Sequence, residues 1–90
     1  MELKFEKKGS SYVVTFEAVS DFNLHIEKEQ GSLQMYQSTV AGDKFDLVDG
    51  FGDKWATGTI DIDFTALVFP KYIRLVSAVE PTKAEVTFAK

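Results

Sequence analysis

Apolar and polar residues alternate along most of the chain with a period of two, which is the pattern of β-strands that bury one face. No segment keeps the 3.6-residue period of an amphipathic helix for long enough to form one. The alternating segments cover residues 2–6, 12–18, 22–28, 33–40, 45–48, 56–64, 72–79 and 84–89. Short strands with turn residues between them predict an all-β, antiparallel β-sandwich of about seven or eight strands, immunoglobulin-like, with a small jelly roll as the alternative.

The C-terminal part of the chain predicts a β-hairpin whose strands are residues 72–79 and 84–89. Pairing across the four residues between them places Leu75 opposite Phe88 and puts the apolar residues of both strands on one face. We therefore expect Leu75 and Phe88 to be neighbours in the core. Val76 then lies on the outer face, where an apolar residue indicates cover by a loop or a partner.

Two further hairpins are predicted nearer the N-terminus. The first two segments pair across a glycine-containing turn, with Phe5 opposite Val14. The third and fourth segments meet at a tight turn that contains Gly31, and this register places His25 opposite Tyr36 on the outer face. We interpret His25 and its polar neighbours as a solvated face of the sheet.

Composition and charge narrow the functional classes. The chain of 90 residues is 44% hydrophobic and 13% aromatic, so residues 1–90 can form one domain with its own core. Ten basic residues against fourteen acidic ones give a net charge of −4, which argues against nucleic-acid binding. The absence of cysteine excludes disulfides and thiolate metal sites. No apolar run approaches the roughly 20 residues of a membrane span. The first residues lack the apolar stretch of a signal peptide, so we expect none within this sequence.

Aspartates concentrate in the middle of the chain, where six of the seven lie between Asp43 and Asp63. Calcium binds hard oxygen ligands, and Asp49 and Asp53 flank two glycines that would let carbonyl groups turn inward. The spacing lacks the Asp-x-Asp-x-Asp-Gly run of a calcium loop. We therefore predict no metal site and no cofactor, and name Asp49 and Asp53 as the residues that would hold calcium if it bound.

Residues 49–55 form the predicted binding loop, with Asp49, Phe51, Asp53 and Trp55 as its ligand-binding residues. Loops at the ends of sandwiches carry function because a rigid sheet positions them. Aromatic rings offer stacking area for a sugar or a protein partner, and carboxylates accept hydrogen bonds. The competing interpretation is that Phe51 and Trp55 fold back and close the end of the core.

The chain has one histidine and no nucleophile motif, so we predict that it is not an enzyme. We expect a non-catalytic interaction or adhesion module that forms part of a larger extracytoplasmic protein and has a protein or glycan as its ligand. One alternative is a carbohydrate-binding module that uses Trp55 and Phe51. Another is a structural subunit that assembles through its sheet edges.

Overall fold

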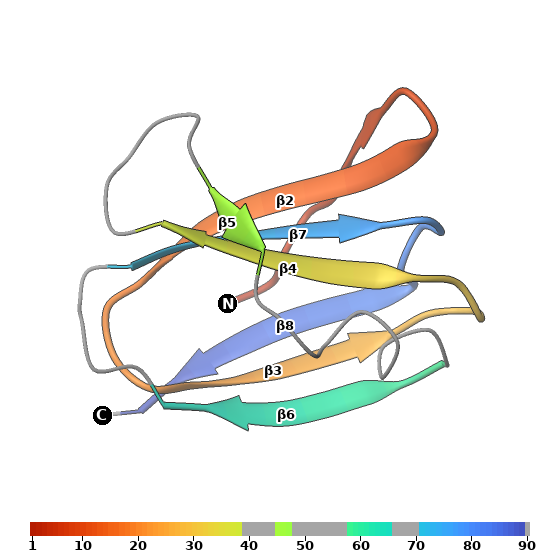
Figure 1. The fold of residues 1–90 in the computed structure, drawn as a ribbon. Helices are drawn as coiled ribbons and strands as arrows, with labels where there is room; N and C mark the ends of the chain where they lie inside the picture. The colour runs from red at the N-terminus through yellow and green to blue at the C-terminus, as the bar shows by residue number, and fades with distance from the viewer. Residues whose placement is uncertain (39–44, 48–57, 66–70, 90) are drawn as a thin grey trace.

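The computed structural model describes residues 1–38, 45–47, 58–65 and 71–89, and the regular elements in these ranges are all β-strands. The strands are β1 (Glu6–Lys8), β2 (Ser11–Ala18), β3 (Phe22–Glu27), β4 (Leu33–Ser38), β5 (Asp46–Leu47), β6 (Ile60–Phe64), β7 (Lys71–Ser77) and β8 (Lys83–Phe88). They form two sheets (Figure 1). The prediction of an all-β, antiparallel structure is confirmed.

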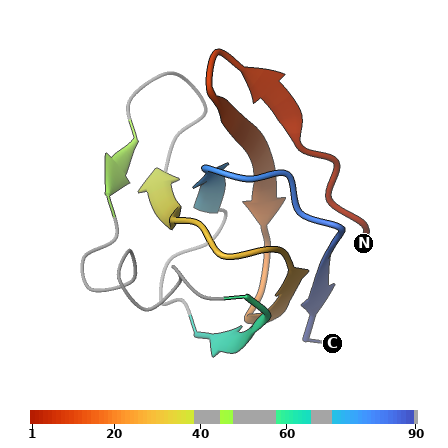
Figure 2. The ribbon, with the colours of Figure 1, turned by 90° about the vertical axis from the view of Figure 1, so that its right-hand side faces the viewer.

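The larger sheet has the strand order β1-β2-β7-β4-β5 and the smaller sheet the order β6-β3-β8. A view along the strands shows the two sheets as facing layers (Figure 2). The described residues contain no helix long and apolar enough to cross a bilayer.

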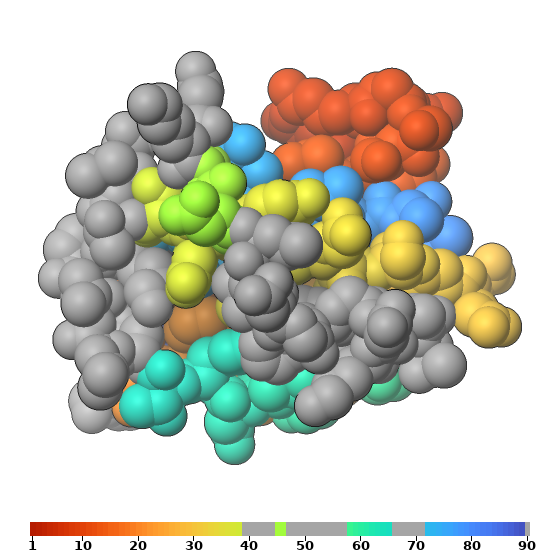
Figure 3. Space-filling view, in the orientation of Figure 1, coloured from red at the N-terminus to blue at the C-terminus, as the bar shows by residue number. Residues whose placement is uncertain are grey.

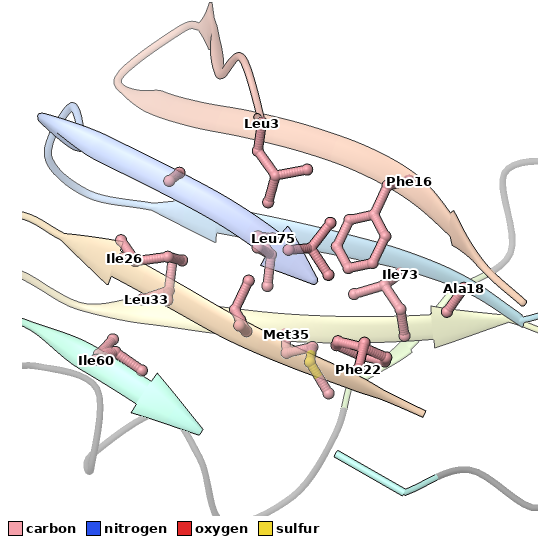
Figure 4. Packing of buried hydrophobic residues seen from close by; sticks show 13 residues of the cluster. Leu3, Phe16, Ala18, Phe22, Ile26, Leu33, Met35, Ile60, Ile73 and Leu75 are labelled. Atoms are coloured by element: carbon pink, nitrogen blue, oxygen red, sulfur yellow. The ribbon is translucent and has the colours of Figure 1, made fainter. Parts of the chain in front are cut away.

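The core lies between the two sheets and is formed by the inward side chains of both. Its buried members are Leu3, Phe16, Ala18, Phe22, Leu24, Ile26, Leu33, Met35, Ile60, Ile73, Leu75, Ala84 and Val86. Figure 4 shows most of them as sticks that point toward one another from facing strands. Burial alternates along β3, β6 and β8 as predicted, because successive side chains of a strand point to opposite faces.

The predicted C-terminal hairpin is wrong, because β7 and β8 belong to different sheets. Leu75 pairs with Val14 and Met35, whereas Phe88 pairs with Phe22 on β3. The chain between β7 and β8 crosses from one sheet to the other, so Leu75 and Phe88 face the same core from opposite sides.

Three backbone-directed hydrogen bonds hold this crossing in place. The amide of Ala78 donates to the Ser32 carbonyl over 2.9 Å, and the amide of Thr82 donates to the Glu27 carbonyl over 2.8 Å. The buried Ser77 hydroxyl donates to the carbonyl oxygen of Val79. The short connection between β7 and β8 can therefore cross from one sheet to the other, although its length would also fit a hairpin.

The predicted pairing of residues 22–28 with residues 33–40 is also wrong. β3 pairs with β6 and β8 in the smaller sheet, and β4 pairs with β5 and β7 in the larger one. His25 consequently lies opposite Asp61 and Glu85, while Tyr36 lies opposite Arg74 on the other sheet. The inward residues were predicted correctly, because alternation sets the face of a residue and leaves the partner strand open.

The N-terminal segment divides its pairing between the two sheets. β1 pairs with β2 in a register that, continued by one residue, places Phe5 opposite Val14, as predicted. The two-residue turn between these strands contains Gly9 at a φ of 63°, a left-handed conformation that favours glycine. Before β1, the chain lies beside β8, where the Leu3 amide donates to the Ala84 carbonyl over 2.8 Å. This change of sheet covers one side of the core, and Leu3 is buried there.

Candidate functional site

The outer face of the smaller sheet carries a net negative charge, and we name it the acidic face. Its outward side chains are Asn23, His25 and Glu27 from β3, Asp61 and Asp63 from β6, and Lys83, Glu85 and Thr87 from β8. Four carboxylates and one lysine give it a charge of −3 with His25 neutral and −2 with His25 protonated. The alternation that buries Leu24 and Ile26 turns these polar residues outward.

His25 lies at the centre of the acidic face between two carboxylates. Its Nδ1 is 2.9 Å from Asp61 Oδ2, and its Nε2 is 3.0 Å from Glu27 Oε2. An ionised carboxylate only accepts hydrogen bonds, so both contacts are hydrogen bonds when the ring is protonated and donates from both nitrogens. The hydrogen bonds to Glu27 and to Asp61 accordingly raise the pKa of His25 above 6.5. Glu85, its neighbour on the other side, adds a third carboxylate nearby.

Asn23 holds two carboxylates of β6 at fixed positions. Its Nδ2 donates to Asp61 Oδ1 over 2.7 Å and to Asp63 Oδ1 over 2.9 Å. The hydrogen bond from Asn23, followed by the one from His25, lowers the pKa of Asp61 below 3.8. Asp61 is therefore ionised and oriented before any partner arrives.

The network makes stability depend on pH in a defined window. The pKa of His25 is raised, so its contribution is complete below pH 6.5 and is lost as pH rises through the folded-state value. The hydrogen bond from His25 lowers the pKa of Glu27 below 4.5, so that contribution is complete above pH 4.5 and is lost as pH falls through the lowered value. We expect the network to stabilise the fold most between pH 4.5 and 6.5.

Melting temperatures of the wild type and His25→Gln between pH 4 and 9 check this expectation. The difference between them should shrink above pH 6.5, and an NMR titration of His25 should give a midpoint above that value. A difference that stays constant across this range would contradict the network.

The carboxylates of the acidic face can bind cations and accept hydrogen bonds. The hydrogen bond from His25 lowers the pKa of the Glu27 carboxyl group. The hydrogen bonds from Asn23 and His25 lower the pKa of Asp61, so the ionised forms of both carboxyl groups are favoured. In the parts of the chain that the structure describes, no three His, Asp or Glu side chains converge to hold a metal ion. The side chains of Glu27, Asp61 and Glu85 keep 45%, 59% and 47% of their surface exposed, so their oxygens can reach a partner.

The residues predicted as a binding loop, Asp49, Phe51, Asp53 and Trp55, lie outside the described residues, and so do the calcium candidates among them. The predicted polar patch of His25 with Tyr36 does not form, because these two residues lie on different sheets. The residues that join His25 instead are on β6 and β8. Their alternation with apolar residues was visible in the sequence as a polar strand face, but the pairing of β6 with β3 was not.

Comparison with known proteins places the chain in no family. No family model, curated protein or solved structure matches it. The geometry of the acidic face therefore supplies the main basis for a function.

Proposed function

We propose that the chain is a non-catalytic protein-interaction module that binds a basic segment of a partner through the acidic face. The observation that carries this proposal is the pair of aspartates on β6, held by Asn23 and His25 with their oxygens exposed. Because these hydrogen-bond acceptors are already oriented on a rigid sheet, little conformational entropy is lost in ordering them when a partner binds. The immunoglobulin-like sandwich predicted from the sequence is part of this proposal, since such sandwiches commonly serve as binding scaffolds.

A basic protein segment suits this face better than a small neutral ligand does. Each exposed ion pair contributes only about 0–1 kcal/mol, so affinity has to come from several contacts at once. A patch of one charge sign also steers an oppositely charged partner and raises the rate of association. An extended segment with a basic residue at every second position would meet the strands at their own period of two.

Titration with a synthetic Lys-Val repeat peptide tests this function by NMR. We expect amide shifts on β6, β3 and β8, and an affinity that falls at least about tenfold in Asp61→Asn/Asp63→Asn, which removes two charges from the face. Asp46→Asn/Glu80→Gln removes the same charge elsewhere on the exposed surface and serves as the control. Shifts spread over both sheets, or equal losses in both variants, would overturn the proposal.

A further inference from the structure

The outer face of the larger sheet carries a groove with the opposite charge, which we name the basic groove. It has a volume of about 620 Å³ and is lined by Lys4, Glu6, Lys8, Val13, Val14, Thr15, Arg74 and Val76. The N-terminal strand forms one wall, and in Figure 3 the red N-terminal residues stand as a ridge beside the blue atoms of β7. Val13 and Val76, which pair across β2 and β7, lie in its floor.

Three cations and one carboxylate give the basic groove a charge of +2 in a chain whose net charge is −4. Arg74 is held in place there: its Nε donates to Thr15 Oγ1 over 3.2 Å, and its guanidinium lies 4.1 Å from the centre of the Phe45 ring. Val76 is half-buried on this outward face. A fixed cation beside an apolar floor is an arrangement that a partner with acidic side chains would cover.

The basic groove and the acidic face point in opposite directions, because they are the outer faces of two sheets packed against each other (Figures 1 and 2). Both are sheet surfaces, on which side chains repeat about every 7 Å along a strand and about every 4.8 Å between strands. Stacked sheet surfaces can therefore bring carboxylates of one surface close to cations of the other. Sheets also stack readily on sheets at a separation of about 10 Å.

We propose that the partner of the acidic face is the basic groove of a second copy of this chain. This inference rests on the proposed function, because it uses the same face, and it adds the identity of the partner. The contact joins two different surfaces, so it is heterologous and leaves a free acidic face at one end and a free groove at the other. Copies would add head to tail into open chains.

The net charge of −4 on each copy opposes this association, whereas opposite charges in the contact favour it. Which effect is larger depends on the distances between the charges and on the salt concentration. The shortest dimension of the molecule is 24 Å, which separates the centres of two stacked copies by more than twice the Debye length of about 10 Å at 0.1 M salt. Charges in direct contact, at about 4 Å, are screened much less. Self-association is therefore expected to strengthen between about 0.01 M and 0.1 M salt and to weaken toward about 1 M salt.

Sedimentation of two complementary variants tests the contact. Lys4→Gln/Lys8→Gln removes two cations from the basic groove, and Asp61→Asn/Asp63→Asn removes two carboxylates from the acidic face. Each variant alone should associate at least tenfold more weakly than the wild type. Their mixture should form a one-to-one dimer and stop there, because one copy keeps only the face and the other only the groove.

The control variant is Lys7→Gln, an exposed cation of β1 that does not line the groove, and it should associate like the wild type. A wild type that stays monomeric at 1 mM in all three salt concentrations would overturn the inference, and so would a mixture that forms no dimer. Binding of a synthetic Glu-Val repeat peptide to the groove of a monomeric wild type would assign the groove to a foreign acidic partner instead. If the Lys-Val peptide still binds the acidic face of a monomeric wild type, only the self-association fails and the proposed function stands.

Discussion

Leu75→Ala is expected to lower the free energy of unfolding by about 3–5 kcal/mol, the range for truncating a leucine that is completely buried. Leu75 has 0% of its surface exposed and lies on β7, between β2 and β4. Its neighbours in the register are Val14 and Met35, and the smaller sheet covers it from the opposite side. Since folded domains are stable by only about 5–15 kcal/mol, this single change removes a large part of the total.

Urea unfolding, followed by circular dichroism, measures the effect of Leu75→Ala. The matched control is Val19→Ala, which also shortens an aliphatic side chain but at a position that is 58% exposed. The control should change stability by no more than about 0.5 kcal/mol. A loss below about 1 kcal/mol for Leu75→Ala would show that this position is not at the centre of the core.

Lys28→Glu is expected to destabilise the fold by about 3–5 kcal/mol, as other uncompensated buried charges do. Lys28 follows Ile26 by two positions, so it points inward, and only 7% of its surface is exposed. Its Nζ donates to the carbonyl oxygens of Gly31 and, over 3.4 Å, of Glu29. A carboxylate at this position would face these carbonyl oxygens, so two hydrogen-bond acceptors would lie against each other without a donor. Burial already lowers the pKa of Lys28, because it disfavours the charged form.

Thermal unfolding compares Lys28→Glu with Lys7→Glu, which makes the same change of charge at an exposed position of β1. Lys28→Met keeps the aliphatic stem and removes the donor, so its loss should be smaller, about 1–3 kcal/mol. Equal melting temperatures for the two glutamate variants would contradict the buried position of Lys28.

The strand faces could be predicted from the sequence alone. Phe22, Leu24 and Ile26 are buried as the alternation predicts, and Ile60 is buried while Asp61 and Asp63 are exposed. These predictions succeed because the period of two belongs to the extended backbone itself and needs no knowledge of the neighbouring strand. The one pairing predicted correctly, between β1 and β2, is joined by a two-residue turn with Gly9 in a left-handed conformation.

The other strand partners were decided by the tertiary structure. The connections from β3 to β4 and from β7 to β8 are short and contain turn residues, which suits a hairpin and a crossing between sheets equally well. The two arrangements bury the same inward residues, so the hydrophobic pattern does not distinguish them. The choice depends on packing between segments distant in the sequence, such as β2 against β7.

The composition of the acidic face was likewise predicted in part from the sequence and decided in part by the tertiary structure. The sequence determined that His25, Asn23, Asp61 and Asp63 point away from the core, because each alternates with buried residues of its own strand. Only the tertiary structure brought His25 against Asp61, which lies 36 positions away, and placed Tyr36 on the other sheet. Local alternation fixes where a side chain points, whereas the charges it meets depend on which strand the whole core selects as its neighbour.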